Sequence, residues 1–403
     1  MIVDTLLHRR LLNPIKVGLA GCGCMGSAFI RQVFITPGIV IKVVCNRDTA
    51  KVRAVFGGKK PCIITDNPDI LINSDVDIIV DMTGSLEYSS QLILKSFKNK
   101  KNVLTMNAEL LATVGCVLNR YAKKYGVLFS DTLGDQPGEE MDLCRYIKHI
   151  GLKPVILGSM KGFLNKHAGI KDILPYVGNN NSQKVMEFTD GTKLSFEQAL
   201  VANASGLTIH QRGMIGVLGK NAHITESFYD FPLEKIEGIS DYILGCGKPF
   251  GVFSIAKQID NSKTLADNLN YLHCGKGPYY CFYKPVHLCF FDTIASIVRM
   301  TELSDEVIRP LDKPVASVIT LAKRNLEIGE IIGDIGNESV YGQCDKFSTI
   351  KSNMLFPIGL SEGCVIKRKK LKDEALSFSD VQIPSGRLID KLWKEQLTNI
   401  NLD

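Results

Sequence analysis

Three glycines stand close together after a short apolar run near the start of the chain, in the segment 21–26, GCGCMG. Gly21 permits a tight turn, Gly23 lets the backbone approach a pyrophosphate, and Gly26 lets a following helix pack closely on the preceding strand. A helical pattern follows at residues 27–34, and its N-terminus offers free N–H groups to phosphate oxygens. Cys24 and Met25 of the loop are counted with the predicted cofactor-binding residues. A glycine-rich turn is the alternative, but the position between a strand pattern and a helix pattern favours a dinucleotide-binding loop.

Two residues at the end of the next β-rich run bear on which dinucleotide the loop would hold. About 20 residues after the loop, an NAD-specific domain places Asp or Glu, which hydrogen-bonds a ribose hydroxyl and would repel a 2′-phosphate. This chain instead has Asn46 followed by Arg47. A guanidinium attracts a 2′-phosphate, so the pair predicts NADP(H) as cofactor. The alternative is that Arg47 is an ordinary exposed residue.

Two further strand ends carry polar residues that suit the edge of a nicotinamide site. The segments DMTGS and TMNAE each follow a β-rich run. Open α/β sheets bind their ligands at the carboxyl ends of the strands. The sequence therefore predicts that Thr83, Gly84, Asn107 and Glu109 edge the nicotinamide ribose, with helix capping by Ser85 and Asn107 as the alternative.

Lys161 stands in a glycine-flanked turn after a strand pattern. Reduction of a carbonyl group needs a proton donor near the developing alkoxide, and cations around any phosphate or carboxylate of the substrate. The Lys161 ammonium could serve either role, or it could be a solvated loop residue. Asp190 and Lys193, in an Asp-Gly-Thr-Lys turn, are further candidates, and their alternative is an ordinary hairpin turn.

Glu197 and Asn203 interrupt a helix pattern that is otherwise rich in Ala, Leu and Val. Each must either find a buried partner or face a cleft, and we favour the cleft. Tyr283 and His287 belong to a segment, residues 275–287, that concentrates Tyr, Lys and His in an expected loop. They are further catalytic candidates, although a histidine beside apolar residues also suits a core position.

The elements that must position these residues begin with an alternation of β-rich runs and helical patterns up to about residue 129. Such alternation predicts a doubly wound parallel sheet, a Rossmann fold of the α/β class. Its strands are expected at residues 15–20, 40–45, 77–81, 102–105 and 127–130.

Four regions are expected along the chain. Residues 1–133 form the dinucleotide-binding Rossmann domain, residues 134–312 an α+β catalytic and dimerisation domain, residues 313–386 a small, separately folded β domain, and residues 387–403 a tail with a short helix. Within the second region, helices are expected near residues 139–150, 195–203 and 291–300, the last packing back onto the first domain.

Composition favours a cytoplasmic globular protein that binds a small molecule. The 403 residues are 45% hydrophobic and 22% charged, which suits two or three cores and excludes a disordered chain. The net charge of +6 comes with no zinc-finger or aromatic RNA-binding pattern, so no nucleic acid is expected. The twelve cysteines are scattered and predict reduced thiols. Neither a signal peptide nor a membrane span is indicated.

Several segments resemble a known family. The glycine loop, the Thr83-Gly84 turn and the Asn107 strand end resemble homoserine dehydrogenase. The later segments resemble the homoserine dehydrogenase-like oxidoreductases that carry a C-terminal SAF domain: GDQPG at 134–138, GSMKGF at 158–163, FTDGTK at 188–193, VANA at 201–204, LAKRNL at 321–326 and PIGL at 357–360.

That family includes the DXR-like (DRL) enzymes, which convert 1-deoxy-D-xylulose 5-phosphate to 2-C-methyl-D-erythritol 4-phosphate with NADPH in isoprenoid precursor synthesis. The resemblance implies an NADPH-dependent reductase or reductoisomerase that forms a homo-oligomer, and it adds Gln136 and Pro137 to the cofactor-binding residues. In the reductoisomerase version, Mg²⁺ or Mn²⁺ held by carboxylates such as Asp190 or Glu197 would polarise the substrate oxygens.

Three other functions are weighed against this one. Homoserine is rejected as substrate because Ala108 stands where homoserine dehydrogenases carry a lysine, and because their later acidic-lysine signature is missing. A keto-sugar or sugar-acid dehydrogenase of carbohydrate or polysaccharide synthesis would keep the hydride step without a rearrangement. A protein of another class, a non-catalytic cofactor sensor or carbohydrate-binding scaffold, would need neither the hydride step nor the rearrangement.

Overall fold

The computed structural model describes residues 2–58, 62–178, 182–220, 224–247, 251–260 and 262–398, and these divide into two compact units. Unit 1 comprises Met1–Gly138, Leu288–Asp312 and Lys391–Asp403. Unit 2 comprises Glu139–His287 and Lys313–Asp390. Among the described residues, no helix is both long and apolar enough to cross a membrane. All twelve cysteines are free thiols, as the sequence predicts.

Unit 1 contains a six-stranded parallel sheet in the order β3-β2-β1-β4-β5-β6. Strands β1 to β3 are added outward on one side of the sheet, and strands β4 to β6 outward on the other side, starting next to β1. This is the strand order of the dinucleotide-binding doubly wound fold. The predicted strands all form, with their bounds shifted by two residues or fewer. The strands are β1 Ile15–Ala20, β2 Ile39–Cys45, β3 Ile63–Thr65, β4 Ile78–Asp81, β5 Asn102–Thr105 and β6 Phe129–Asp131.

Helices alternate with these strands, and side chains at their first turns fix where several begin. Asp48, Ser85 and Asn107 each accept a hydrogen bond from a backbone N–H of the helix that follows, which satisfies an otherwise unpaired donor. The helices of this unit are α1 Ile2–Arg9, α2 Cys24–Phe34, α3 Thr49–Phe56, α4 Pro68–Asn73, α5 Leu86–Lys98, α6 Ala108–Tyr125, η3 Cys289–Phe291 and α13 Thr293–Leu303.

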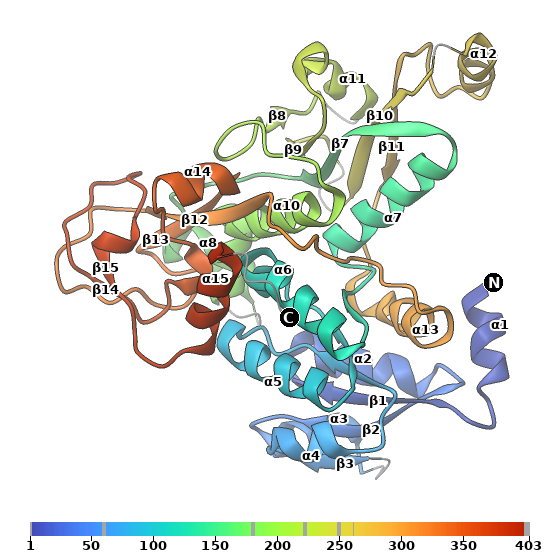
Figure 1. Ribbon diagram of the computed structural model, residues 1–403, viewed down its shortest axis with the longest axis vertical. Helices are drawn as coiled ribbons and strands as arrows, with labels where there is room; N and C mark the ends of the chain where they lie inside the picture. The colour runs from blue at the N-terminus through green and yellow to red at the C-terminus, as the bar shows by residue number, and fades with distance from the viewer. Residues whose placement is uncertain are drawn as a thin grey trace. The chain divides into compact units, whose positions relative to one another are not determined.

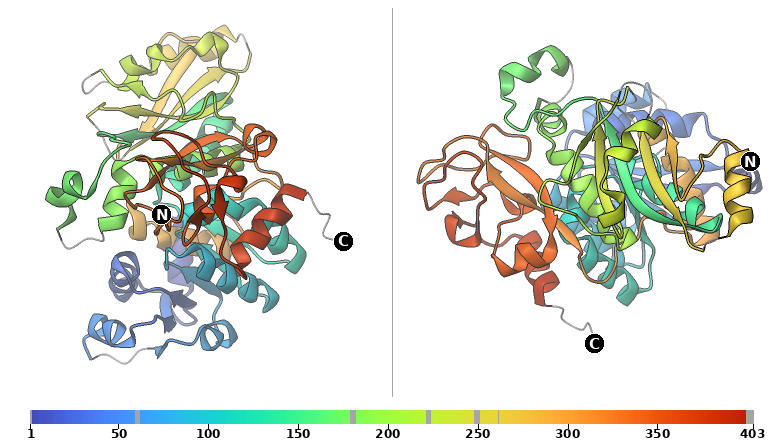
Figure 2. Two further views of the ribbon diagram at one scale, coloured as in Figure 1. Left: turned by 90° about the vertical axis from the view of Figure 1, so that its left-hand side faces the viewer. Right: turned by 90° about the horizontal axis from the view of Figure 1, so that it is seen from above.

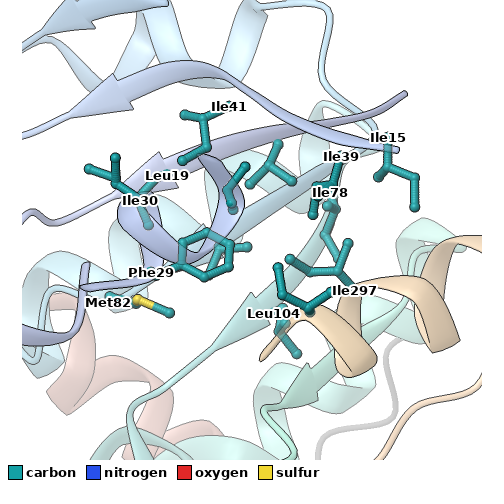
Figure 3. Packing of buried hydrophobic residues seen from close by; sticks show 14 of the residues in the cluster. Ile15, Leu19, Phe29, Ile30, Ile39, Ile41, Ile78, Met82, Leu104 and Ile297 are labelled. Atoms are coloured by element: carbon teal, nitrogen blue, oxygen red, sulfur yellow. The ribbon is translucent and has the colours of Figure 1, made fainter. Parts of the chain in front are cut away.

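The core of unit 1 joins the sheet to helices that are far apart in the sequence. Phe29 of α2 and Leu19 of β1 are fully buried in one apolar cluster, together with Ile297 of α13. Figure 3 shows Ile297 beside Leu104 of β5. Burial of such a side chain is worth about 1.5–3 kcal/mol. The predicted packing of the helix near residues 291–300 onto the first domain is confirmed.

Unit 2 is built on a five-stranded mixed sheet in the order β11-β10-β7-β9-β8. The strands β10 and β11 run antiparallel, and their yellow ribbons lie side by side in both views of Figure 2. The strands are β7 Leu152–Lys161, β8 Val217–Leu218, β9 Ile239–Leu244, β10 Val252–Gln258 and β11 Tyr279–Lys284. The helices are α7 Gln136–His149, which begins in unit 1, α8 Ile170–Val177, α9 Ser182–Thr189, α10 Thr192–Ser205, α11 Ile224–Ser227, η1 Phe228–Asp230, η2 Leu233–Lys235 and α12 Lys263–Tyr271.

The C-terminal β segment packs on α10 within unit 2. Figure 1 shows its strands β12 and β13 beside this helix. The separately folded domain that the sequence predicts at residues 313–386 stays a prediction, and in the structure this segment is grouped with α10 in unit 2 and bonded to it through buried polar groups. The Gly342 N–H, for example, donates to the Thr192 hydroxyl at 2.8 Å. The elements are β12 Ala316–Ala322, β13 Val340–Lys346, α14 Phe347–Ser352, η4 Ile358–Leu360, β14 Val365–Ile366, η5 Phe378–Asp380, β15 Val381–Gln382 and the tail helix α15 Leu388–Thr398, which ends in unit 1.

Candidate functional site

The glycine loop between β1 and α2 has the geometry of a phosphate cradle. Gly21 has a φ of 94°, and a Cβ there would lie 2.6 Å from the carbonyl oxygen of Met82. A Cβ on Gly26 would collide with the carbonyl oxygen of Gly21, whereas one on Gly23 would meet only open space. The helix starts at Cys24, and its first N–H groups have no acceptor within the helix. The loop therefore leaves room and donors for an anion.

Asn46 holds this loop in place. Its Oδ1 accepts a hydrogen bond from the Cys22 N–H at 2.9 Å, and its Nδ2 donates to the Asp48 carbonyl at 2.8 Å. The neighbouring Arg47 is exposed and makes no hydrogen bond or ion pair with any residue in the described ranges. Asn46 thus positions the loop backbone, while Arg47 is the residue whose charge is available to a ligand.

Asp81, at the end of β4, organises the next strand end, and the sequence argument missed it. Its Oδ1 accepts hydrogen bonds from the Thr83 hydroxyl at 2.7 Å and the Thr83 N–H at 3.1 Å. Burial raises the pKa of Asp81, and these hydrogen bonds oppose the rise. Gly84 follows with a φ of 71°. Thr83 therefore faces Asp81, and a carboxylate at a strand end was the available signal.

Capping, the alternative weighed for Ser85 and Asn107, is what the structure shows. Ser85 accepts from the Tyr88 N–H at 3.4 Å, and Asn107 accepts from the Leu110 N–H at 3.0 Å. Glu109, in the first turn of α6, is 3% exposed. Contacts of Asn107 and Glu109 with a nicotinamide ribose stay a prediction.

Gln136 and Pro137 open α7 at the end of unit 1. Gln136 is 2% exposed, and its N–H donates to Oδ1 of Asp135 at 3.1 Å. A Cβ on Gly138 would collide with the carbonyl oxygen of Thr132. The turn is therefore closely packed on β6, and a cofactor contact of Gln136 or Pro137 stays a prediction.

In unit 2, the structure brings Lys161 and Glu197 together. Lys161 is the last residue of β7 and Glu197 lies on α10, and their Nζ and Oε2 atoms are 2.8 Å apart. The Lys161 side chain is 14% exposed and that of Glu197 is 1% exposed. The pair is thus largely shielded from water, which strengthens its attraction. Glu197 finds a buried partner, the alternative to the cleft that the sequence favoured.

A second carboxyl group, which the sequence argument missed, belongs to the same cluster. Glu140 of α7 accepts hydrogen bonds at Oε1 from the Ser159 hydroxyl at 2.8 Å and from Nε2 of Gln198 at 2.7 Å. Burial raises the pKa of Glu140 to about 8, and the charge of Glu197 adds to the rise. Gln198, a further polar residue in the apolar helix pattern, was the signal that could have led to this cluster.

Asp190 lies elsewhere, in a buried ion pair with the C-terminal segment. Its Oδ2 is 2.7 Å from Nζ of Lys323, and its Oδ1 accepts from the Thr192 N–H at 2.9 Å. Burial raises the pKa of Asp190, and the Lys323 charge opposes the rise. The predicted hairpin alternative is wrong, because Gly191, with a φ of 83°, starts α10 directly after α9. Lys193 follows in the first turn of that helix and is partly buried.

Asn203 clamps the start of β12. Its Oδ1 accepts from the N–H groups of Val315 and Ala316 at 2.7 and 3.0 Å, and its Nδ2 donates to the Ala316 carbonyl at 3.0 Å. Its amide is occupied by backbone, so the arrangement is that of a buried structural residue rather than of a side chain facing a cleft.

Tyr283 lies on β11 rather than in the expected loop. It stands opposite Phe253 of β10, which stands opposite Gly158 of β7. Successive residues of a strand point to opposite faces, so the register places Tyr283 on the face away from Lys161. His287 follows β11 and is partly buried. The structure does not bring Tyr283 to the Lys161 pair.

A cavity of about 250 Å³ opens at the first turn of α10. Its lining includes Asp190, Ser195, Tyr242 and Gln343. Leu244, which pairs with Lys161 across β9 and β7, also lines it. The cavity therefore adjoins the strand ends that carry Lys161.

Two family models match successive parts of the chain. Residues 134–293 match the catalytic domain of the oxidoreductase DRL. Residues 21–129 match the NAD binding domain of homoserine dehydrogenase. The first match contains the Lys161 cluster, and the second contains the glycine loop.

Curated relatives match about a quarter of the chain. Homoserine dehydrogenase of Bacillus subtilis is 29% identical over 124 residues, 28% of this chain and 28% of that protein. L-aspartate dehydrogenase of Methanocaldococcus jannaschii is 30% identical over 102 residues, 24% of this chain and 37% of that protein. The chain thus spans well under half of the length of these relatives.

Among solved structures, a homoserine dehydrogenase from Thiobacillus denitrificans matches with a TM-score of 0.41 and 15% identity over 90% of this chain and 98% of that one. A scyllo-inositol dehydrogenase from Lactobacillus casei with bound NAD(H) and scyllo-inositol has a TM-score of 0.44 and 12% identity over 73% and 91%. The two family matches, together with the parallel sheet and its glycine loop, support an NAD(P)-dependent oxidoreductase in which residues 21–129 are similar to the NAD binding domain of homoserine dehydrogenase and residues 134–293 to the catalytic domain of the oxidoreductase DRL.

Proposed function

We propose that this oxidoreductase uses NADPH to reduce a small anionic carbonyl compound, with 1-deoxy-D-xylulose 5-phosphate as the leading substrate. One observation carries the proposal: the shielded Lys161–Glu197 pair lies inside the part of the chain that matches the DRL catalytic domain. The resemblance to the DRL enzymes implies the leading substrate, and the positive charge of Lys161 suits a phosphorylated one.

Reduction of a carbonyl consumes one hydride and one proton and yields an alcohol. The nicotinamide cofactor, when bound, supplies the hydride. The Lys161 ammonium can donate a hydrogen bond to the carbonyl oxygen, and then a proton to the alkoxide as charge develops there. Glu197 holds the ammonium in one orientation, because its carboxylate lies 2.8 Å from Nζ.

The choice of NADPH over NADH is supported by the end of β2. A 2′-phosphate would meet no carboxylate at position 46, and Arg47 is exposed with no partner among the described residues. Because an Arg guanidinium can form two charge-assisted hydrogen bonds with a phosphate, Arg47 is the proposed reader of the cofactor.

The residues considered for a divalent cation do not fit one. Asp190 is bonded to the ammonium of Lys323, and Glu197 to that of Lys161. Within the described ranges, no group of three or more His, Cys, Asp or Glu side chains could hold a metal ion. The proposal therefore assigns a metal role to neither carboxylate, and the steps above use none.

The proposal also includes a role for the C-terminal segment and an assembly of several copies of the chain. Residues 313–386 form a SAF-like module that positions α10, since Asn203 and Asp190 bind it directly. A cytoplasmic homo-oligomer is proposed for the assembled enzyme, as the resemblance implies.

A substrate screen tests the proposal. NADPH oxidation is followed with 1-deoxy-D-xylulose 5-phosphate and with a panel of keto-sugars and keto-sugar phosphates. We expect oxidation with a phosphorylated ketose, and its loss in Lys161→Ala. Turnover with unphosphorylated keto-sugars alone would favour a sugar dehydrogenase, and no turnover with any ketose would favour a non-catalytic sensor; either result overturns the proposal.

A further inference from the structure

The Glu140 carboxyl group is bonded on one oxygen only. Both of its hydrogen-bond donors, the Ser159 hydroxyl and the Gln198 amide, point at Oε1. Oε2 is buried and has no hydrogen-bond partner in the described part of the chain. An ionised carboxylate would leave a charged oxygen buried without a donor, which is costly.

The surroundings fix which way those donors point. The Ser240 hydroxyl lies 2.6 Å from Oε1 of Gln198 and 2.9 Å from the Gln198 backbone carbonyl oxygen, and with Oε1 on that side, Nε2 of the amide faces Glu140. Four elements take part: α7 carries Glu140, β7 carries Ser159, α10 carries Gln198 and β9 carries Ser240. A carboxylic acid suits this frame better than a carboxylate, because its carbonyl oxygen accepts the two hydrogen bonds and the oxygen without a partner is then a neutral hydroxyl. Burial of a neutral hydroxyl costs less than burial of a charged oxygen.

The charges around Glu140 also favour the protonated form of its carboxyl group. The ionisable groups that act on it are Glu197 of α10 and Lys161 of β7, and Cys144 lies on its own helix, one turn further on. Lys161 and Glu197 already form a pair with no net charge. A second carboxylate in this buried cluster would have no cation of its own.

We propose that Glu140 is a positioning residue that keeps a proton, so that Glu197 alone is the carboxylate partner of Lys161. The cluster then consists of one ammonium, one carboxylate and one carboxylic acid. The inference rests on the proposed function in one respect: the Glu140 proton serves to keep the charge of Lys161 available to an anionic substrate. Loss of the Glu140 proton adds a negative charge beside Lys161 and weakens binding of that substrate.

Infrared spectroscopy of the full chain tests the proton directly and needs no substrate. The C=O stretching band of a protonated carboxyl group is followed from about pH 6 to about pH 10, a range that spans the expected titration. We expect a band that disappears with a midpoint near pH 8 and that is missing in Glu140→Gln. Glu139→Gln is the matched control, because Glu139 is the adjacent buried residue and pairs with Lys284 instead.

Two further variants separate a titrating cluster from a merely structural carboxyl group. Glu197→Gln removes a repulsive charge and should lower the midpoint by about one pH unit, whereas Lys161→Met removes an attractive one and should raise it. A wild-type protein without the band, or a band that survives in Glu140→Gln, overturns the inference. So do midpoints that do not move in Glu197→Gln and Lys161→Met.

The same variants give a functional readout once a substrate is known. The KM for an anionic substrate should rise above about pH 8 in the wild type and stay level in Glu140→Gln. A rise that persists in Glu140→Gln contradicts the inference. If the infrared titration is found but no ketose is reduced, the proton assignment stands and the proposed function fails.

Discussion

Nζ of Lys161 lies 2.8 Å from Oε2 of Glu197, and both side chains are largely shielded from solvent. An ammonium held in this way keeps one orientation at little entropic cost. Glu197→Gln retains the size of the side chain but removes its charge, so we expect kcat for ketose reduction to fall about 10- to 100-fold. NADPH affinity should stay unchanged, because the glycine loop lies in unit 1. Steady-state kinetics with a fluorescence titration of NADPH check both.

Two alanine substitutions in the glycine loop should separate stability from cofactor binding. Gly26→Ala places a methyl group against the carbonyl oxygen of Gly21, and overpacking of this kind costs about 1–3 kcal/mol. Gly23→Ala meets open space in the protein and should leave the melting temperature nearly unchanged while weakening NADPH binding. Calorimetry and cofactor titration measure the two effects. Equal stability of the two variants would contradict the packing described for Gly26.

Asn46 and Arg47, which follow β2, are expected to have different roles. Arg47→Ala should lower the preference for NADPH over NADH by at least about tenfold in kcat/KM, because it removes the guanidinium that attracts a 2′-phosphate. Asn46→Ala should instead weaken both cofactors alike, since Asn46 bonds the Cys22 N–H of the loop. Kinetics with both cofactors distinguish these outcomes. A wild-type enzyme that prefers NADH would show that Arg47 does not read the phosphate.

Glu140 should make stability depend on pH. Its pKa is raised from 4.5 to about 8 in the folded protein, so the folded state holds a proton that the unfolded chain releases at lower pH. The contribution to stability is full below about pH 4.5 and is lost as the pH rises through about 8. The difference is on the order of a few kcal/mol. Denaturant unfolding should show this decline in the wild type, and the same slope in Glu140→Gln would argue against it.

The buried pair of Asp190 and Lys323 ties the C-terminal segment to α10. Asp190→Asn leaves the ammonium without its carboxylate and should cost about 3–5 kcal/mol of unfolding free energy. Combining Asp190→Asn with Lys323→Met removes both charges and should cost less than the single substitution. A double-mutant cycle by denaturant unfolding measures the coupling, and additive effects would show that the pair is not coupled.

The Rossmann part could be predicted from sequence because its signals are local. The strands Ile15–Ala20 and Asn102–Thr105 have the predicted bounds, and the three glycines have their expected spacing. The role of Asn46 could not be derived, because its hydrogen bond to Cys22 crosses 24 residues. Capping by Asn107 was foreseen only as an alternative.

The second half shows where local reasoning fails. Asp190-Gly191 suits a hairpin turn, yet a glycine with positive φ can also begin a helix, and here it begins α10. Glu140 follows another glutamate in a polar helix start, which is typical of an exposed first turn. Its hydrogen-bond partner Gln198 lies 58 residues away in the sequence, and a pairing at that distance leaves no local pattern. Lys161 and Glu197 were both selected, but as separate candidates rather than as a pair.

The rate of NADPH oxidation in Lys161→Ala tests the central claim most directly. The assay uses saturating NADPH and 1-deoxy-D-xylulose 5-phosphate, or the ketose phosphate that gives the highest wild-type rate, with Lys153→Ala as a control from the exposed start of β7. We predict that kcat in Lys161→Ala falls by at least about 100-fold, on the order of 3 kcal/mol of transition-state stabilisation, while NADPH affinity and the Lys153→Ala rate stay near those of the wild type. A near-normal kcat in Lys161→Ala would contradict the assignment of Lys161 as the proton donor.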